Sequence, residues 1–254
     1  YGTLTLDADG KYSYTLNTAM NSGATQGANT VNGVETFTYT ATDANGNTVQ
    51  GTITVNIKDD VPDANADVDT VTEGGTTTGN VLTGESTVGG TTGTGVDVPG
   101  ADGFATPSTV VGVVSGSNTT APVSGGTGTE IQGLYGKLTL NADGTYSYVS
   151  TANAITANAV DTFVYTIADK DGDLSTTTLQ INLTDVTLTG QTPAVTVDEA
   201  ALQSGSTPSS TDETAGGTLS VAGATSYTLS GNGQGQYGTL TLDADGKYSY
   251  TLNT

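Results

Sequence analysis

The chain has 254 residues, of which 34% are hydrophobic, and 26 acidic residues against five basic ones give it a formal net charge of −21. It contains no cysteine, histidine, tryptophan or arginine. This composition excludes a disulfide framework and disfavours binding to nucleic acid or anionic membranes, which require a basic surface. A chain with this net charge either repels itself or binds cations.

The first predicted element is a β-hairpin with the sequence YGTLTLDADGKYSYTLNT, from Tyr1 to Thr18. The same residues recur unchanged from Tyr237 to Thr254, and a looser version begins at Tyr135. Apolar and polar residues alternate on both sides of an Asp-Ala-Asp-Gly turn, which is typical of a hairpin with one buried face. We interpret these aspartates as turn formers, and we expect the chain to be part of a longer tandem array.

A second pair of strands follows from Val34, with the sequence VETFTYTATDANGNTVQGTITVNI. A related sequence, VDTFVYTIADKDGDLSTTTLQINL, begins at Val160. Both have period-two alternation on either side of a polar turn that contains glycine, so each predicts two long antiparallel strands. A shorter repeat therefore lies within the longer one.

Polar segments around Pro62 and after Leu183 indicate two boundaries. We expect residues 1–61 to be the C-terminal part of one immunoglobulin-like repeat, 62–187 a complete repeat, and 188–254 the N-terminal part of the next. The middle repeat contains a Gly/Thr-rich loop, 84–103, and a strand near residues 109–114. Helical periodicity is nearly absent apart from a short turn at 198–202, so the predicted fold class is all-β: tandem immunoglobulin-like (cadherin-like) β-sandwich domains with antiparallel Greek-key sheets.

The two terminal pieces each lack half of a sandwich. Joining residues 188–254 to residues 19–61 would give one complete domain. Because unpaired strand edges and uncovered faces seek partners, we expect head-to-tail complementation between chains, in addition to packing between neighbouring repeats of one chain. The alternatives are a longer natural chain or poorly ordered terminal pieces.

The most specific acidic pattern is Asp169-x-Asp171-Gly172-Asp173, with Asp161 at the start of the preceding strand. Ca²⁺ takes six to eight oxygen ligands from carboxylates and carbonyls, so this pattern predicts a calcium site; the alternative is an ordinary β-turn. No flanking helix or distal glutamate makes it an EF-hand. A weaker copy of the pattern has fewer charges, at Asp43, Asn45 and Asn47.

Further acidic residues lie at the predicted boundaries and in the Gly/Thr-rich loop. Like charges at a joint would push it apart unless a cation lies among them, so we expect Ca²⁺ here as well. The alternatives are ordinary solvated linkers and a polar surface loop. The candidate ligands are Asp59, Asp60, Asp63 and Glu73 at the first joint, Asp185, Asp198 and Glu199 at the second, and Asp97 and Asp102 in the loop.

Enzymatic activity is not expected. Without histidine or cysteine there is no Ser-His-Asp or Cys-His arrangement, and without arginine there is no bidentate phosphate clamp. Two carboxylates could hydrolyse a glycoside, but the tyrosines and phenylalanines follow strand patterns and are better explained as core residues. No apolar run approaches the ~18–20 residues of a membrane helix, so direct membrane insertion is not expected.

The hairpin phrase YGTLTLDADGKYSYTL, followed by ETFTYTATDANGNT and GTITVNI, resembles the VCBS and related immunoglobulin-like repeats of giant bacterial RTX-type adhesins. The resemblance implies calcium-rigidified tandem domains at the bacterial cell surface, exported by a type I system. It favours a structural extender that holds a distal ligand-binding region away from the cell. The alternatives are a glycan- or peptide-binding adhesion module and cohesion between identical arrays.

Overall fold

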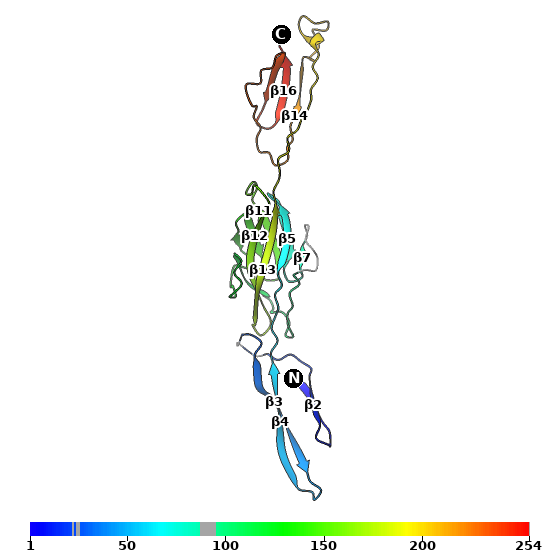
Figure 1. The fold of residues 1–254 in the computed structure, drawn as a ribbon, viewed down its shortest axis with the longest axis vertical. Helices are drawn as coiled ribbons and strands as arrows, with labels where there is room; N and C mark the ends of the chain where they lie inside the picture. The colour runs from blue at the N-terminus through cyan, green and yellow to red at the C-terminus, as the bar shows by residue number, and fades with distance from the viewer. Residues whose placement is uncertain (22, 24–25, 87–94, 254) are drawn as a thin grey trace. The chain divides into compact units, whose positions relative to one another are not determined.

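The computed structural model describes residues 1–21, 23, 26–86 and 95–253. The chain divides into two compact units, residues 1–185 and 186–254. Part of the predicted Gly/Thr-rich loop, residues 87–94, lies outside the described residues. Within the described part, the only helical element is the three-residue 3₁₀ helix η1 (Glu199–Ala201), and the regular structure is otherwise β, as the sequence predicts (Figure 1).

The first unit begins with two hairpins that form separate antiparallel sheets. Their strands are β1 (Gly2–Leu6), β2 (Tyr12–Leu16), β3 (Thr30–Thr42) and β4 (Thr48–Lys58). Gly10 and Gly46 provide the positive φ values that the two tight turns require, 85° and 86°. The Tyr14 ring packs against Phe37, with 6.2 Å between ring centroids, so the short hairpin contacts the long one.

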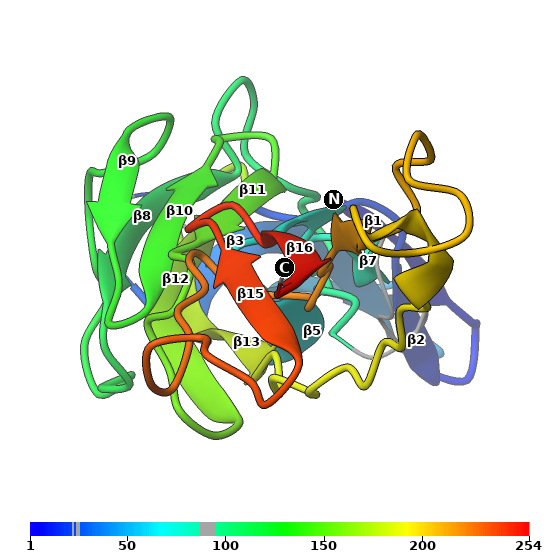
Figure 2. The ribbon, with the colours of Figure 1, turned by 90° about the horizontal axis from the view of Figure 1, so that it is seen from above.

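The remainder of the first unit is a sandwich of two sheets, whose strands can be followed in Figures 1 and 2. One sheet has the order β7-β6-β11-β10-β9, and the other has the order β5-β13-β12-β8. The strands are β5 (Asp67–Thr72), β6 (Thr76–Asn80), β7 (Glu85–Ser86), β8 (Val110–Ser115), β9 (Glu130–Gln132), β10 (Gly136–Leu140), β11 (Thr145–Ser150), β12 (Ala159–Ala168) and β13 (Leu174–Thr184). We call these strands and their loops the middle domain.

The core of the middle domain lies between these sheets. Alternate residues of β10 and β11 point inward and meet alternate residues of β12 and β13, as the period of two requires. Tyr148 packs edge-on against Phe163, with centroids 6.0 Å apart. Leu138, Tyr148 and Phe163 are completely buried. The Tyr148–Phe163 contact is equivalent to the Tyr14–Phe37 contact, but it lies inside the core.

One strand pair differs from the antiparallel prediction. β5, the first strand of the middle domain, pairs in parallel with β13, its last, with Asp67 opposite Leu179 and Thr72 opposite Thr184. Since both strands run in the same direction, the chain enters the domain at one end of this pair and leaves at the other. The segment before β5 therefore passes the start of β13, where Ala64 N–H donates to Ser175 Oγ at 3.0 Å.

A matched pair of substitutions tests this difference in packing between repeats. Leu138 and Leu4 occupy equivalent hairpin positions, opposite Tyr148 and Tyr14. Leu138 is completely buried and Leu4 is half-buried. We expect Leu138→Ala to lower the free energy of unfolding of the middle domain by about 2–5 kcal/mol, because it leaves a cavity. In chemical denaturation, Leu4→Ala should have a much smaller effect; equal effects would contradict this packing.

The second unit contains one antiparallel sheet with the order β14-β16-β15. Its strands are β14 (Thr214–Thr218), β15 (Gly238–Leu242) and β16 (Lys247–Leu252), and β15 and β16 form the predicted hairpin. Asp198 caps η1 by accepting a hydrogen bond from Ala200 N–H at 2.9 Å, which explains the predicted short turn.

Candidate metal site

The turn between β12 and β13 presents three aspartates around Gly172. Asp169 Oδ1 accepts hydrogen bonds from the backbone N–H groups of Gly172 and Asp173 at 3.0 and 2.8 Å, and Gly172 has a φ of 99°. These bonds use one oxygen of the Asp169 carboxylate to fold the turn. Asp169 Oδ2 is buried and has no hydrogen-bond partner.

The turn between β3 and β4 has the same backbone geometry but different chemistry. Asp43 Oδ1 accepts from Asn45 N–H and Asn47 N–H at 2.9 and 2.8 Å, and Asp43 Oδ2 accepts from the Asn47 side-chain amide at 2.9 Å. The hydrogen bond from this amide is the main reason that the pKa of Asp43 is lowered. The Asn47 amide therefore satisfies Asp43 Oδ2 within the turn. Its counterpart Asp173 has a carboxylate, which only accepts, so Asp169 Oδ2 is left without a partner.

Two other segments bring carboxylates to the Asp169 turn. Among the described residues, two groups each have carboxylate oxygens within 4.8 Å of one another. Asp171 belongs to both groups. One group contains Asp59, Asp171 and Asp173, and the other contains Asp102, Asp169 and Asp171. We call these five residues the acidic cluster; they could hold a metal ion.

Backbone contacts hold the segments of the acidic cluster together. Gly27 N–H donates to Asp173 Oδ1 at 2.6 Å, and Asp59 N–H donates to the Asn29 carbonyl at 2.7 Å. On the other side, Lys170 N–H donates to the Gly103 carbonyl at 3.0 Å. The cluster thus joins the segments that flank the β3–β4 hairpin to two loops of the middle domain.

Three residues of the cluster are buried, and Asp102 and Asp171 are half-buried. Asp59, Asp169 and Asp173 are 5%, 1% and 1% exposed, and both Asp59 oxygens and Asp173 Oδ2 are buried without a hydrogen-bond partner. Burial, followed by the neighbouring Asp171 carboxyl, raises the pKa of Asp169 to about 7. Burial also raises the pKa values of Asp102 and Asp173, with contributions from nearby carboxylates.

This arrangement favours a hard cation. Both ion pairs found among the described residues, Tyr1–Glu35 and Lys137–Glu130, lie outside the cluster. Buried carboxylates without partners are costly unless a cation or protons neutralise them. Oxygen ligands at about 2.3–2.6 Å from Ca²⁺ lie within about 5 Å of one another, and the observed spacing satisfies this limit. The residues present therefore fit a Ca²⁺ ion.

Asp161 does not join the cluster, contrary to the sequence pattern. It lies near the start of β12, whereas the turn follows the end of that strand. Its completely buried carboxylate accepts hydrogen bonds from Leu134 N–H, Tyr135 N–H and the Tyr148 hydroxyl at 3.0, 3.0 and 2.9 Å. These three donors satisfy the charge, so Asp161 links the two sheets.

Asp97, predicted to act with Asp102, lies instead beside Asp67 and Tyr165. The Tyr165 hydroxyl is 2.8 Å from Asp67 Oδ2 and 3.2 Å from Asp97 Oδ2. Because this hydroxyl has a single proton, it cannot donate to both carboxylates. Burial raises the pKa of Asp67 to about 8 and that of Asp97 to about 7. Asp67, Asp69 and Val71 alternate along β5 and are its buried residues. This alternation is the sequence signal that indicates the burial of Asp67.

The remaining candidates at the first joint separate. Asp60 Oδ2 accepts from Ala101 N–H at 2.9 Å and so anchors the loop that presents Asp102. Asp63 is exposed and forms a β-bridge with Val98. Glu73 is not at this joint: its N–H donates to the Thr184 carbonyl at 3.1 Å, at the end of β13. The strand β5 separates Glu73 from Asp59, so a role for Glu73 in binding Ca²⁺ stays a prediction.

The candidates at the second joint belong to different units. Asp185 N–H donates to Asn158 Oδ1 at 3.0 Å, at the end of the first unit. Asp198 and Glu199 are exposed at η1 in the second unit. A calcium site shared by these residues stays a prediction.

The pair Asp67 and Asp97 predicts a pH-dependent stability. At pH 5–7 the folded protein keeps protons that the unfolded chain has released, so the free energy of unfolding should fall as pH rises from about 4 to about 8. Asp67→Asn should flatten this dependence and raise stability at pH 8 by about 1–3 kcal/mol, because the amide still accepts from Tyr165 without a buried charge. Urea unfolding in calcium-depleted buffer measures this change in the free energy of unfolding. If Asp67→Asn were less stable than the wild type at pH 8, the raised pKa of Asp67 would be contradicted.

Comparison with known proteins gives one match. Residues 1–56 match the family described as bacterial Ig domain. No curated protein matches the chain. The match supports a bacterial Ig-like repeat, a kind of domain often found in surface proteins and typically structural rather than catalytic. None of the helical segments in the described residues is long and apolar enough to cross a membrane.

Proposed function

We propose that this chain is a calcium-stiffened structural extender of a giant repetitive bacterial surface adhesin of the VCBS and RTX type, located outside the cell. It would hold a distal ligand-binding region away from the surface. The observation that carries this proposal is the acidic cluster, in which carboxylates from separate segments converge and both Asp59 oxygens, Asp169 Oδ2 and Asp173 Oδ2 are buried without a hydrogen-bond partner.

The position of the cluster suggests how Ca²⁺ would act. Asp59 follows β4 directly, and Asp171 and Asp173 belong to a turn of the middle domain. An ion bound to all three would fix the end of the β3–β4 hairpin against that turn. Asp102, held through Asp60 and Ala101, would bind the second loop in the same way. Without the ion, repulsion among these carboxylates would loosen the same contacts.

A non-catalytic role is consistent with the chemistry of the chain. The carboxylates with raised pKa values belong to the Asp67–Asp97–Tyr165 group or to the acidic cluster, and the chain has no histidine or cysteine to act as a base or nucleophile. The alternative is recognition of a glycan or peptide by the Gly/Thr-rich loop, whose central residues lie outside those described. Specific hits on a glycan array would favour that alternative.

Distance measurements across the cluster test the proposed stiffening. The chain has no native cysteine, so spin labels can be attached to Asn45→Cys and Asn141→Cys, both exposed turn positions. Ca²⁺ should narrow the distance distribution between the labels, and chelation should broaden it. Adding Asp171→Asn should leave the distribution broad in both conditions. A distribution that Ca²⁺ does not change would contradict the extender mechanism.

A further inference from the structure

The first and last strands of the middle domain are neighbours in one sheet and run in the same direction (Figure 1). β5 and β13 pair over six residues, from Asp67 opposite Leu179 to Thr72 opposite Thr184. The chain enters this pair before Asp67 and leaves it after Thr184, at opposite ends of the ladder. A pull on the two ends of the domain therefore acts along both strands in opposite directions, and it loads all the hydrogen bonds between them in shear at the same time.

β5 is held in its sheet by fewer strand pairs than β13. Within the described residues, β5 is an edge strand that pairs with β13, whereas β13 also pairs with β12 over ten residues. Two hydrogen bonds extend the β5–β13 contact beyond the ladder: Ala64 N–H donates to Ser175 Oγ at 3.0 Å, and Glu73 N–H donates to the Thr184 carbonyl at 3.1 Å. Separating β5 breaks fewer bonds than separating β13, so the resistance of the domain to a pull is set at β5.

A buried carboxylate in the middle of β5 fixes this strand to the opposite sheet. Asp69 is 1% exposed, and its Oδ2 accepts hydrogen bonds from Thr77 Oγ1 at 2.6 Å and from the Tyr146 hydroxyl at 2.8 Å. Thr77 belongs to β6 and Tyr146 to β11. Asp69 Oδ1 accepts from Thr70 N–H at 2.7 Å and from the Ser86 hydroxyl. Since a carboxylate accepts stronger hydrogen bonds than a neutral group, these donors resist movement of Asp69.

β5 cannot slide past β13 in small steps. Side chains alternate between the two faces of a strand, so a shift by one residue, about 3.3 Å, would turn the buried Asp69 and Val71 to the solvent face. A shift by two residues would restore the alternation but would move Asp69 about 7 Å away from Thr77 and Tyr146. Either shift breaks the ladder and the Asp69 hydrogen bonds together, which gives a high barrier to forced unfolding.

We propose that β5, β13 and Asp69 form a mechanical clamp that keeps the middle domain folded while the chain is under tension. The parallel ladder resists the pull, and Asp69 keeps β5 in register with β13 by fixing it to β6 and β11. This role goes beyond the proposed function, because a spacer needs length alone, whereas a clamp maintains that length against a force. It also assigns a function to a buried carboxylate outside the acidic cluster.

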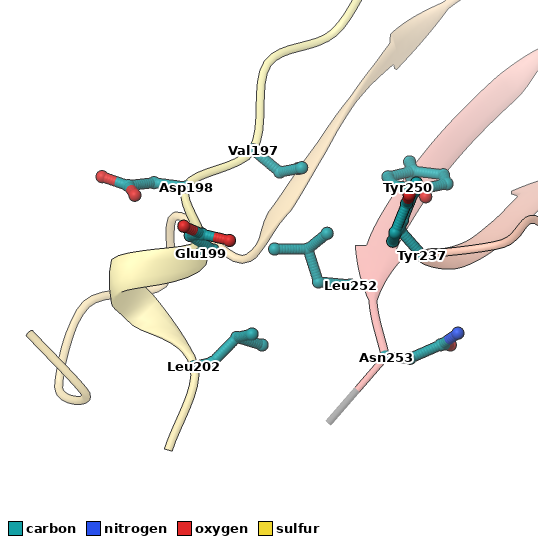
Figure 3. Close-up of a pocket in the computed structure, with 8 residues that line it drawn as sticks. All are labelled: Val197, Asp198, Glu199, Leu202, Tyr237, Tyr250, Leu252 and Asn253. Atoms are coloured by element: carbon teal, nitrogen blue, oxygen red, sulfur yellow. The ribbon is translucent and has the colours of Figure 1, made fainter. Parts of the chain in front are cut away.

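The short hairpins of this chain have the opposite geometry. In β15–β16, Gly238 lies opposite Leu252, and Asn253 N–H donates to the Tyr237 carbonyl at 2.8 Å. The two ends of this hairpin are therefore adjacent; Tyr237, Leu252 and Asn253 are labelled in Figure 3. A pull on these two ends opens the ladder from one side, one residue pair at a time, so each step breaks few bonds.

Optical tweezers on the full chain test the clamp, with handles attached under reducing conditions to introduced cysteines, since the chain has no native cysteine. Ala66→Cys with Thr184→Cys applies the force along β5 and β13. Thr72→Cys with Thr184→Cys applies it across one end of the same ladder, because these residues are paired. All three positions are exposed. At equal pulling speed, the unfolding force should be several times higher in the first geometry. Tyr237→Cys with Asn253→Cys, also exposed, gives a reference at low force.

Two matched variants separate the clamp from ordinary stability. Tyr146→Phe removes a hydrogen bond to Asp69 of β5, and Tyr148→Phe removes a hydrogen bond to Asp161 of β12. Both should lower the free energy of unfolding in urea to a similar extent, because each removes one hydroxyl from a buried carboxylate. When the force acts along β5 and β13, Tyr146→Phe should lower the unfolding force more than Tyr148→Phe, since the pull is not applied to β12.

Three results would overturn the clamp: equal unfolding forces in the two geometries, equal losses of force from the two tyrosine variants, or a difference between geometries that requires Ca²⁺. The first comparison needs no core substitution, and circular dichroism checks that the tyrosine variants are folded. Each measurement is made with Ca²⁺ and with chelator. The difference between geometries should persist in chelator, because it depends on strand direction. A persistent difference together with an absence of calcium binding would contradict only the proposed function.

Discussion

Millimolar Ca²⁺ is expected to raise the melting temperature of the middle domain by roughly 20 °C over the calcium-depleted protein. Binding to the folded state adds RT ln(1 + [L]/Kd), which is about 2.7 kcal/mol for a site at a hundredfold excess over its Kd. The two overlapping groups of the acidic cluster would together give about 5 kcal/mol, and about 1 kcal/mol moves the midpoint of such a domain by roughly 4 °C. Scanning calorimetry measures this shift.

The turn between β3 and β4, which is equivalent to the Asp169 turn, supplies a control variant. Asp173→Asn reproduces the side chain found at Asn47, whose amide donates to Asp43 Oδ2. In calcium-depleted buffer this variant should melt higher than the wild type, because the new amide can donate to Asp169 Oδ2 and one buried charge is removed. It should also lose most of the calcium response. A variant that is destabilised without calcium and still responds fully to Ca²⁺ would show that the cluster is not the site.

Removing the Asp161 side chain should destabilise the middle domain by about 4 kcal/mol, because Asp161→Ala leaves one buried and two partly buried donors without their acceptor. The largest part of this loss comes from the Tyr148 hydroxyl, which is completely buried, whereas the bonds from Leu134 N–H and Tyr135 N–H are partly buried. Asp161→Asn, which keeps one acceptor oxygen, should have a smaller effect. Urea unfolding in saturating Ca²⁺ measures both variants.

The same variants separate a structural role from a ligand role. Asp161→Ala should leave the calcium affinity of the folded domain unchanged, since Asp161 lies at the opposite end of β12 from Asp169. Isothermal titration below the melting temperature checks this. A tenfold loss of affinity would contradict the placement of Asp161. Glu35→Ala, at the equivalent position of β3, should have a weaker effect on stability, because its side chain is 22% exposed.

Local sequence patterns determined the strands of this protein. The alternation in β3–β4 and β12–β13, together with Gly46 and Gly172 in their turns, is sufficient to predict each hairpin and its turn, although not the register shift between Val31 and Glu35. The repetition of β1–β2 as β15–β16 likewise follows from the sequence alone. These features depend on residues close together in the chain, where side-chain direction and backbone conformation are set locally.

The tertiary structure decided which carboxylates meet. Asp59, Asp102 and Asp171 belong to three separate sequence patterns. Asp59 reaches the turn because β5 pairs in parallel with β13 and carries the preceding segment past it, and Asp102 reaches it because Phe104 forms a β-bridge with Asp169. The same topology takes Glu73 and Asp161 away from the site. The sequence by itself determined a chain of repeated β-hairpins rich in carboxylates. Whether a given aspartate shapes a turn, links two sheets or faces a cation was decided by contacts between residues distant in the chain, which no local pattern encodes.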